Sequence, residues 1–120
     1  MKTLVICICT YKRNESLAQC LKSLKKLNTK KKIKIIILII DNTTNYESFN
    51  LVKKMKKNFV HRIIQINESK RGVVHARNKA LKKLKKLEPQ YVSFIDDDCT
   101  IDKLWLINIL KIIKKNNADI

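Results

Sequence analysis

The sequence contains only one glycine and one proline in 120 residues, Gly72 and Pro89. A chain so poor in both residues has no flexible linker and no low-complexity segment, and we find no internal repeat. At this length we expect one domain at most. The hydrophobic share of 45% is enough to form a single packed core, which excludes an intrinsically disordered chain.

Metal-binding and disulfide patterns are also missing. The four cysteines, Cys7, Cys9, Cys20 and Cys99, show no C-x-x-C spacing, and only two histidines are present, which argues against a zinc site. Cys7 and Cys9 lie in an apolar run and Cys20 on an apolar helix face, where free thiols behave as small hydrophobic groups. Free thiols are typical of a reducing compartment, so we expect a cytoplasmic protein.

No apolar run has the length of a membrane span. The run 33–40 has eight residues, whereas a spanning helix needs about 20. The apolar stretch 3–9 at the N-terminus is too short for a signal peptide. The sequence therefore favours a protein without a spanning segment.

Negative charge is scarce, with 10 Asp and Glu against 27 Lys and Arg and a net charge of +17. Such an excess suggests anionic partners, namely nucleotides, nucleic acid or an acidic membrane surface. Most lysine runs fall on the outer faces of predicted helices, so we favour a solvated surface. We keep peripheral contact with the inner face of a membrane as a second interpretation.

A basic nucleic-acid-binding module without enzymatic activity is the main alternative function. Aromatic residues make up only 6% of the chain, and the basic runs lack the interleaved aromatic side chains of single-strand binders. We therefore expect no nucleic-acid partner.

Hydrophobic periodicity predicts strands that alternate with helices. The predicted strands are 4–9, 33–40, 60–66 and 91–95, and the predicted helices are 14–27, 46–57, 73–87 and one capped by Asp102. Asn14 or Ser16 is expected to cap the first helix, and 118–120 to begin a further strand. This order predicts an α/β fold, an open and mostly parallel sheet of about four strands with helices on both faces.

The helices are amphipathic, and their apolar positions predict the core. The side chains expected on inner faces are Leu17, Cys20, Leu21, Leu24, Leu27, Phe49, Val52, Met55, Ala76, Ala80, Leu84, Leu87, Leu106, Ile109, Leu110 and Ile113.

A strand order of 3-2-1-4 would make the first and fourth strands neighbours. Open parallel sheets bind ligands beyond the carboxyl ends of their strands, where the strand order reverses. Thr10 and Tyr11 would then face the same crevice as residues 96–98, with Asp41 at the end of the next strand.

Three adjacent carboxylates, Asp96, Asp97 and Asp98, directly follow the last predicted strand. Desolvating even one unpaired carboxylate costs several kcal/mol, so the trio must face solvent or a counterion. A hard divalent metal that also binds substrate phosphates would supply the positive charge. The alternative is a solvated acidic turn that caps the next helix.

Four segments of the sequence resemble signatures of the family 2 glycosyltransferases, which have the GT-A nucleotide-diphospho-sugar fold. Residues 9–13 are similar to the first-strand signature of that family, and residues 39–42 to its second-strand aspartate. Arg71–Gly72 with residues 76–80 is similar to its glycine and Ala-Arg-Asn helix, and residues 94–98 to its metal-binding D-x-D. Four signatures in order, each at a predicted strand end or loop, are more specific than the D-x-D alone.

The resemblance implies a nucleotide-diphospho-sugar donor, commonly a UDP-sugar. Thr10 and Tyr11 would bind the base by hydrogen bonding and stacking, and Arg13 belongs to the same signature. Asp41 would accept a hydrogen bond from the base. The alternatives are that Tyr11 is only a rim residue and that Asp41 closes an Asx turn.

The resemblance also implies which residues would lie near the diphosphate and which would hold a metal. Arg71 would lie near the diphosphate and Gly72 would let the backbone approach the nucleotide, although a solvated arginine and a loop end explain them too. Asp96 would bind the ribose and, with Asp98, hold Mn²⁺ or Mg²⁺, which stabilises the departing nucleoside diphosphate. Asp97 would point elsewhere, because alternate residues of an extended chain face opposite sides.

The general base of this family lies beyond residue 120, so no catalytic residue is assigned. We expect residues 1–120 to be the donor-binding half of an inverting transferase, incomplete at its C-terminus. A missing segment would bind the acceptor, a glycan or a lipid-linked molecule. A flavodoxin-like phospho-acceptor domain is a third interpretation, which the polar edge at Thr10 and Tyr11 fits poorly.

Overall fold

Four strands form one sheet in which each neighbouring pair is parallel. The computed structural model describes residues 2–27, 29 and 33–116. The strands are β1 (Thr3–Thr10), β2 (Lys34–Asp41), β3 (Arg62–Asn67) and β4 (Tyr91–Asp96). The sheet is open and parallel, as predicted, and its order is β3-β2-β1-β4, the order considered from the sequence, with the first and fourth strands side by side.

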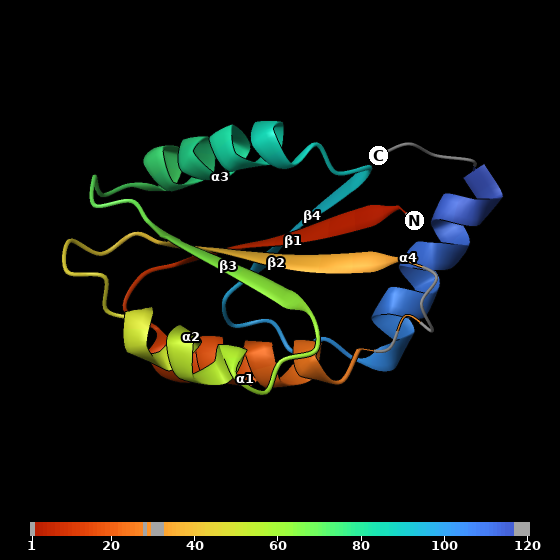
Figure 1. Ribbon diagram of the computed structural model, residues 1–120, viewed down its shortest axis with the longest axis horizontal. Helices are drawn as coiled ribbons and strands as arrows, with labels where there is room; N and C mark the ends of the chain where they lie inside the picture. The colour runs from red at the N-terminus through yellow and green to blue at the C-terminus, as the bar shows by residue number, and fades with distance from the viewer. Residues whose placement is uncertain (1, 28, 30–32, 117–120) are drawn as a thin grey trace.

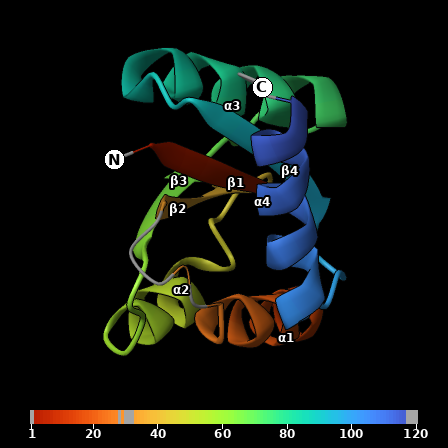
Figure 2. The same ribbon diagram turned by 90° about the vertical axis from the view of Figure 1, so that its right-hand side faces the viewer.

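Helices cover both faces of the sheet, as predicted. The helices are α1 (Asn14–Lys25), α2 (Phe49–Lys56), α3 (Val73–Leu87) and α4 (Lys103–Asn116). Figure 1 shows α3 lying across one face and α1 and α2 side by side under the other. In Figure 2, α4 begins near α1 and rises beside β4. The helices α1, α2 and α3 each return the chain to the start of the next strand, so the carboxyl ends of the parallel strands meet at one edge.

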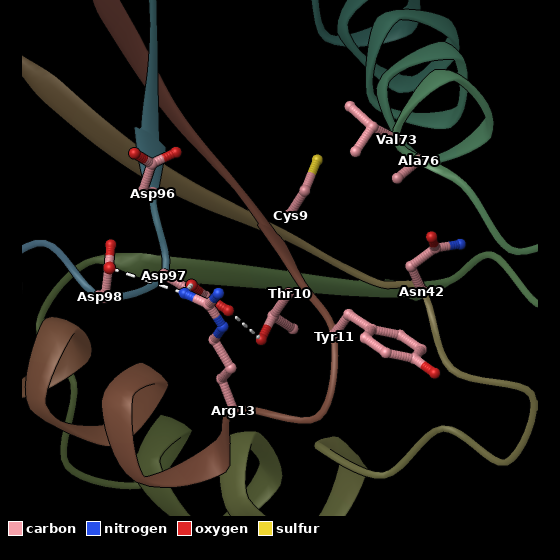
Figure 3. A pocket seen from close by; sticks show the side chains of 10 residues that line it. All are labelled: Cys9, Thr10, Tyr11, Arg13, Asn42, Val73, Ala76, Asp96, Asp97 and Asp98. Carbon is pink, nitrogen blue, oxygen red and sulfur yellow. Dashed lines mark hydrogen bonds and ion pairs between the residues drawn. The ribbon is translucent and has the colours of Figure 1, made fainter.

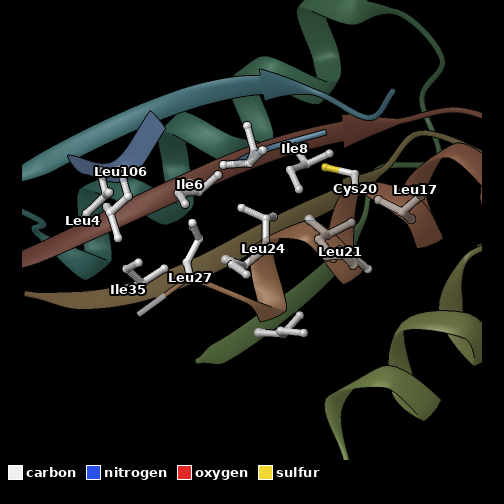
Figure 4. Packing of buried hydrophobic residues seen from close by; sticks show 14 of the residues in the cluster. Leu4, Ile6, Ile8, Leu17, Cys20, Leu21, Leu24, Leu27, Ile35 and Leu106 are labelled. Atoms are coloured by element: carbon white, nitrogen blue, oxygen red, sulfur yellow. The ribbon is translucent and has the colours of Figure 1, made fainter. Parts of the chain in front are cut away.

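The core consists of two hydrophobic clusters separated by the sheet. Leu4, Ile6 and Ile8 of β1 point towards α1 and α4, whereas Val5 and Cys7 point towards α3. Figure 4 shows the first cluster packed between β1, β2 and α1. Strands buried on both faces need continuous apolar runs, which is why β1 and β2 do not alternate in sequence. Full burial of each such leucine or isoleucine contributes about 2 kcal/mol.

The second helix differs from its prediction. It begins at Phe49 instead of residue 46, because the backbone N–H of Ser48 is hydrogen-bonded to Asp41. Phe49 was expected on the inner face, and this prediction is wrong because its side chain is 38% exposed. Its ring packs edge-to-face against Tyr46, with centroids 5.1 Å apart. Val52 is buried, as predicted.

Helix termini were only partly predicted. Neither Asn14 nor Ser16 caps α1, whose N-cap is Arg13 without a side-chain hydrogen bond, and the Asn14 amide donates to the Glu47 carbonyl instead. Asp102 does cap α4, because its carboxylate accepts from the Trp105 backbone N–H at 2.9 Å.

In α4, Leu106 is buried as predicted. The side chain of Ile113 and the strand expected at 118–120 lie outside the residues that the structure describes. None of the helices within the described ranges is long and apolar enough to cross a membrane.

Candidate functional site

A cavity of about 400 Å³ opens at the carboxyl ends of β1 and β4 (Figure 3). This is the crevice predicted from the strand order, and its size suits a small-molecule ligand. Strand ends, the loop after β2 and the first turn of α3 all contribute to its lining, which consists of Cys9, Thr10, Tyr11, Arg13, Asn42, Val73, Ala76, Asp96, Asp97 and Asp98. Of the predicted site residues, Asp41, Arg71 and Gly72 lie outside this lining.

The three carboxylates do not act as one group. Asp97 is buried at 6% exposure, accepts a hydrogen bond from the Thr10 hydroxyl at 2.9 Å, and lies 3.5 Å from an Arg13 guanidinium nitrogen. Asp96 and Asp98 are exposed. Figure 3 shows Asp97 directed towards Thr10 and Arg13. The hydroxyl and the guanidinium compensate the buried charge of Asp97, which makes it a structural carboxylate.

The remaining two carboxylates gather with a thiol. One potential ligand atom each from Asp96, Asp98 and Cys99 lies within 4.8 Å of the others. Two carboxylates match the oxygen ligands that Mg²⁺ and Mn²⁺ prefer, so the donor set fits the predicted metal. Cys99 was missed by the sequence reasoning, although it directly follows the trio.

Arg13 connects the two groups of carboxylates. The same guanidinium nitrogen that contacts Asp97 lies 3.6 Å from an Asp98 oxygen. The Arg13 and Asp98 side chains are both more than half exposed, so this pair contributes little to stability. Asp98 is therefore available to a stronger cation.

The aromatic ring of Tyr11 is held from one side by Arg71. The Arg71 guanidinium carbon lies 4.4 Å from the ring centroid, a cation–π contact. Lys12 also approaches the ring, with its nitrogen 5.5 Å from the centroid. Arg71 was expected beside the diphosphate, but in this structure it stacks against the base-binding candidate Tyr11.

The carboxylate of Asp41 is hydrogen-bonded within its own loop. Its carboxylate is 1% exposed and accepts from the backbone N–H and the hydroxyl of both Thr43 and Ser48. Burial alone would raise the pKa of Asp41, but the hydrogen bonds from Ser48 and Thr43 outweigh it and hold the pKa below its ordinary value. A base could use Asp41 only by displacing one of these donors, so the geometry favours the Asx-turn alternative.

Asn42, which follows Asp41, also lines the cavity. Its amide nitrogen donates to the carbonyls of Glu68 and Lys70 at 2.8 and 2.9 Å, and its amide oxygen accepts from the Gly72 N–H at 2.9 Å. These three bonds fix the loop that carries Arg71. Asn42 lies in the second-strand signature, but sequence reasoning gave it no role.

Gly72 stands at the start of α3 with a φ of +132°. An added Cβ would lie 3.5 Å from the His75 ring, an ordinary contact, so conformation and not space requires glycine here. The Arg-Asn pair of the helix signature lies away from the cavity lining. The Arg77 guanidinium carbon stacks 5.2 Å from the Phe94 ring centroid, and Asn78 is exposed.

The buried thiols of Cys7 and Cys20 and the half-buried thiol of Cys9 are not activated as nucleophiles. Burial raises the pKa of both Cys7 and Cys20 to about 12, and it also raises the pKa of Cys9. Thiols with such pKa values are neutral at physiological pH. They act as small hydrophobic groups, as the sequence indicated.

Comparison with known proteins identifies the family. The family model described as Glycosyl transferase family 2 matches residues 5–120. The chain belongs to this family. This family 2 glycosyltransferase chain is also similar to the succinoglycan biosynthesis protein ExoM of Rhizobium meliloti (strain 1021), with 26% identity over 111 residues. The resemblance inferred from the four signatures is thereby confirmed.

Solved structures with the same fold include complexes with nucleotides or nucleotide sugars. S. aureus TarS in complex with UDP superimposes with a TM-score of 0.78 at 25% identity over 99% of this chain, and its UDP-GlcNAc complex with 0.68 at 26% over 99%. The mannosyltransferase PcManGT of Pyrobaculum calidifontis, in complex with GDP-Man and Mn²⁺, shares the fold with a TM-score of 0.60 at 16% identity over 79%.

The family 2 chain is short beside these proteins. It covers 35% of ExoM, 34% and 33% of the TarS 1–349 chain in the UDP and UDP-GlcNAc complexes, and 27% of PcManGT. The matched third includes the sheet edge with the cavity.

Proposed function

We propose that residues 1–120 form the donor-binding part of a glycosyltransferase that uses a nucleotide-diphospho-sugar, with UDP as the nucleotide. The observation that carries this proposal is the pair Asp96 and Asp98 at the end of β4, beside Tyr11 in one cavity. The UDP and UDP-GlcNAc complexes of TarS support the choice of uracil.

In this proposal the base stacks on Tyr11. Arg71 holds the ring from one side, so the ring is ordered before the nucleotide arrives, which reduces the entropy lost on binding. Thr10 is a positioning residue, because its hydroxyl donates to Asp97 and its carbonyl accepts from the Asn42 N–H. Asp41 would act indirectly: its hydrogen bonds order the loop that begins at Asn42.

Asp96 and Asp98 would hold Mn²⁺ or Mg²⁺, with the Cys99 thiol beside them. Held by these residues, such an ion would supply positive charge for the departing nucleoside diphosphate. Arg13 contributes fixed positive charge at the same place, because its guanidinium lies between Asp97 and Asp98. Asp96 would also accept hydrogen bonds from the ribose hydroxyls.

The acceptor-binding site and the general base are proposed to lie in the part of the protein that the relatives carry outside the matched third. A glycan or a lipid-linked molecule would be the acceptor. An inverting reaction requires a carboxylate that takes the proton of the acceptor hydroxyl. The carboxylates that line the described cavity are Asp96, Asp97 and Asp98, which already have other roles.

The test is calorimetric titration of the full chain with UDP, with and without Mn²⁺. We expect metal-dependent binding that Asp98→Asn weakens by at least about tenfold, since it removes a charged ligand. Glu88→Gln is the matched control, because Glu88 is exposed and lies just before β4 begins, at the opposite end of the strand. GDP should bind more weakly than UDP.

An equal loss of UDP affinity in both variants, or UDP binding that does not depend on Mn²⁺, would refute the metal site. Tighter binding of GDP would refute uracil while leaving the donor site intact. No binding at all by a chain whose circular dichroism shows it to be folded would refute the donor site.

A further inference from the structure

A second cavity, of about 250 Å³, lies between α3 and the edge strand β3. It shares no lining residue with the cavity at the ends of β1 and β4. Its floor is Ile66 of β3, and its walls are four lysines of α3: Lys79, Lys82, Lys83 and Lys86. We call this feature the lysine groove.

The spacing of these lysines concentrates charge on one face of α3. Positions i, i+3, i+4 and i+7 are neighbours on a helix, and like charges there repel each other. Between described residues, the carboxylates in ion pairs are Asp97 and Asp98, which pair with Arg13, so none compensates the groove lysines. The row extends over roughly 10 Å of helix. No ion pair with a described carboxylate offsets this repulsion, and an external anion would relieve it.

The exposure and lining of the lysine groove suit contact with an external anionic surface. Lys79 and Lys83 are half-buried, whereas Lys82 and Lys86 are exposed. Lysine stems can cover an apolar floor such as Ile66 while the ammonium groups reach outwards. The groove is lined by no arginine and no aromatic side chain, the groups that stack on nucleic-acid bases.

We propose that the lysine groove docks the protein onto a membrane surface rich in anionic phospholipid, with the ammonium groups of α3 at the headgroup phosphates. Juxtaposed lysines add their individual attractions to an anionic leaflet, and the attraction falls off within a Debye length. The proposal is independent of donor binding, because the two cavities have separate linings.

The experiment measures co-sedimentation of the full chain with vesicles of equal parts phosphatidylglycerol and phosphatidylcholine, and with vesicles of phosphatidylcholine alone. The groove variant carries four substitutions, Lys79→Gln, Lys82→Gln, Lys83→Gln and Lys86→Gln. The matched control neutralises four exposed lysines of α2 or its end, on the opposite face of the sheet: Lys53→Gln, Lys54→Gln, Lys56→Gln and Lys57→Gln. Glutamine is a good helix former, so both helices should remain intact.

The wild type should bind the anionic vesicles and not the neutral ones, with binding lost at high salt. The groove variant should lose at least about tenfold in partition coefficient, and the α2 variant less than about threefold. Equal losses in the two variants would overturn the proposal in favour of attraction by net charge alone. Unchanged binding in the groove variant would overturn it too, as would loss of affinity for a single-stranded oligonucleotide without loss for vesicles. UDP titration of the groove variant, expected to be unchanged, keeps this result separate from the donor site.

Discussion

Asn42 is the side chain that connects the two halves of the candidate donor site. Its backbone N–H donates to the carbonyl of Thr10 at the end of β1, and its amide group makes three hydrogen bonds to the loop 68–72. That loop carries Arg71, which orders the Tyr11 ring. The position of the stacking ring thus depends on one buried amide.

We predict that Asn42→Ala lowers the affinity for UDP by about tenfold and the free energy of unfolding by roughly 1–3 kcal/mol, because it leaves the Gly72 N–H without its acceptor. Asn42→Asp should lower both by a similar amount, since a carboxylate keeps the acceptor but faces two backbone carbonyls without a donor. Calorimetry and urea unfolding measure the two quantities.

Asn45→Ala is the matched control for Asn42, because Asn45 is exposed in the same loop. It should change neither quantity by a measurable amount. If Asn42→Ala loses stability but binds UDP as tightly as the wild type, Asn42 supports only the fold and not the site.

The role of Asn42 could not be predicted from sequence. Its partners lie 26 to 30 residues away and are backbone groups, so no residue type marks them. The hydrogen-bond partners of Asp41 and Asp97 could not be predicted from sequence either. The position of a carboxylate at a strand end can be predicted from sequence. The sequence does not tell whether nearby hydroxyl groups will donate hydrogen bonds to its oxygens. Tyr11, Asp96 and Asp98 were predictable to line one crevice because strand ends fix their location.

At the scale of elements, the start of α2 depends on Asp41. The chain after β2 wraps around this carboxylate, and the helix can begin only after Ser48 has donated to it. The sequence predicted an earlier start because residues 46–57 fit a helical period, and tertiary hydrogen bonds override such a pattern. The other helices were located within a few residues because their apolar stripes face the sheet.

We predict that α2 and its loop make the protein sensitive to acid through Asp41. Its pKa is lowered in the folded state, so its contribution to stability is fully present above the unfolded pKa, near 3.8, and is lost as the pH falls through the folded pKa. Asp41→Asn should therefore lower the free energy of unfolding by roughly 2 kcal/mol at neutral pH, and the difference from the wild type should shrink below pH of about 4.

Urea unfolding at neutral and acid pH measures this difference. Asp102→Asn is the control, because Asp102 is an exposed cap of α4 and should show only a small change. A difference for Asp41→Asn that stays constant across the pH range would show that the shape of the hydrogen-bonded loop, and not the charge of Asp41, sets the stability.

For the whole molecule, general rules of chain connection narrow the possible strand orders, whereas no such rule applies to the charge distribution. Right-handed crossovers and short loops limited the topology to few arrangements, and the observed one is the order 3-2-1-4 that was considered from the sequence. The 27 basic residues face only 10 acidic ones. Between described residues, ion pairs join Arg13 to Asp97 and Asp98, so most of the lysine charge remains uncompensated within these ranges.

This imbalance predicts that salt stabilises the protein. With a net charge of +17, the folded state concentrates positive charges that the unfolded chain spreads apart, and counterions screen their repulsion. Raising NaCl from low to physiological ionic strength should increase the free energy of unfolding by roughly 1 kcal/mol. The α2 variant that neutralises four lysines should start from a higher stability and gain less from salt. A wild type that becomes less stable as NaCl is added would mean that attractive charge pairs outweigh the repulsion in the folded state.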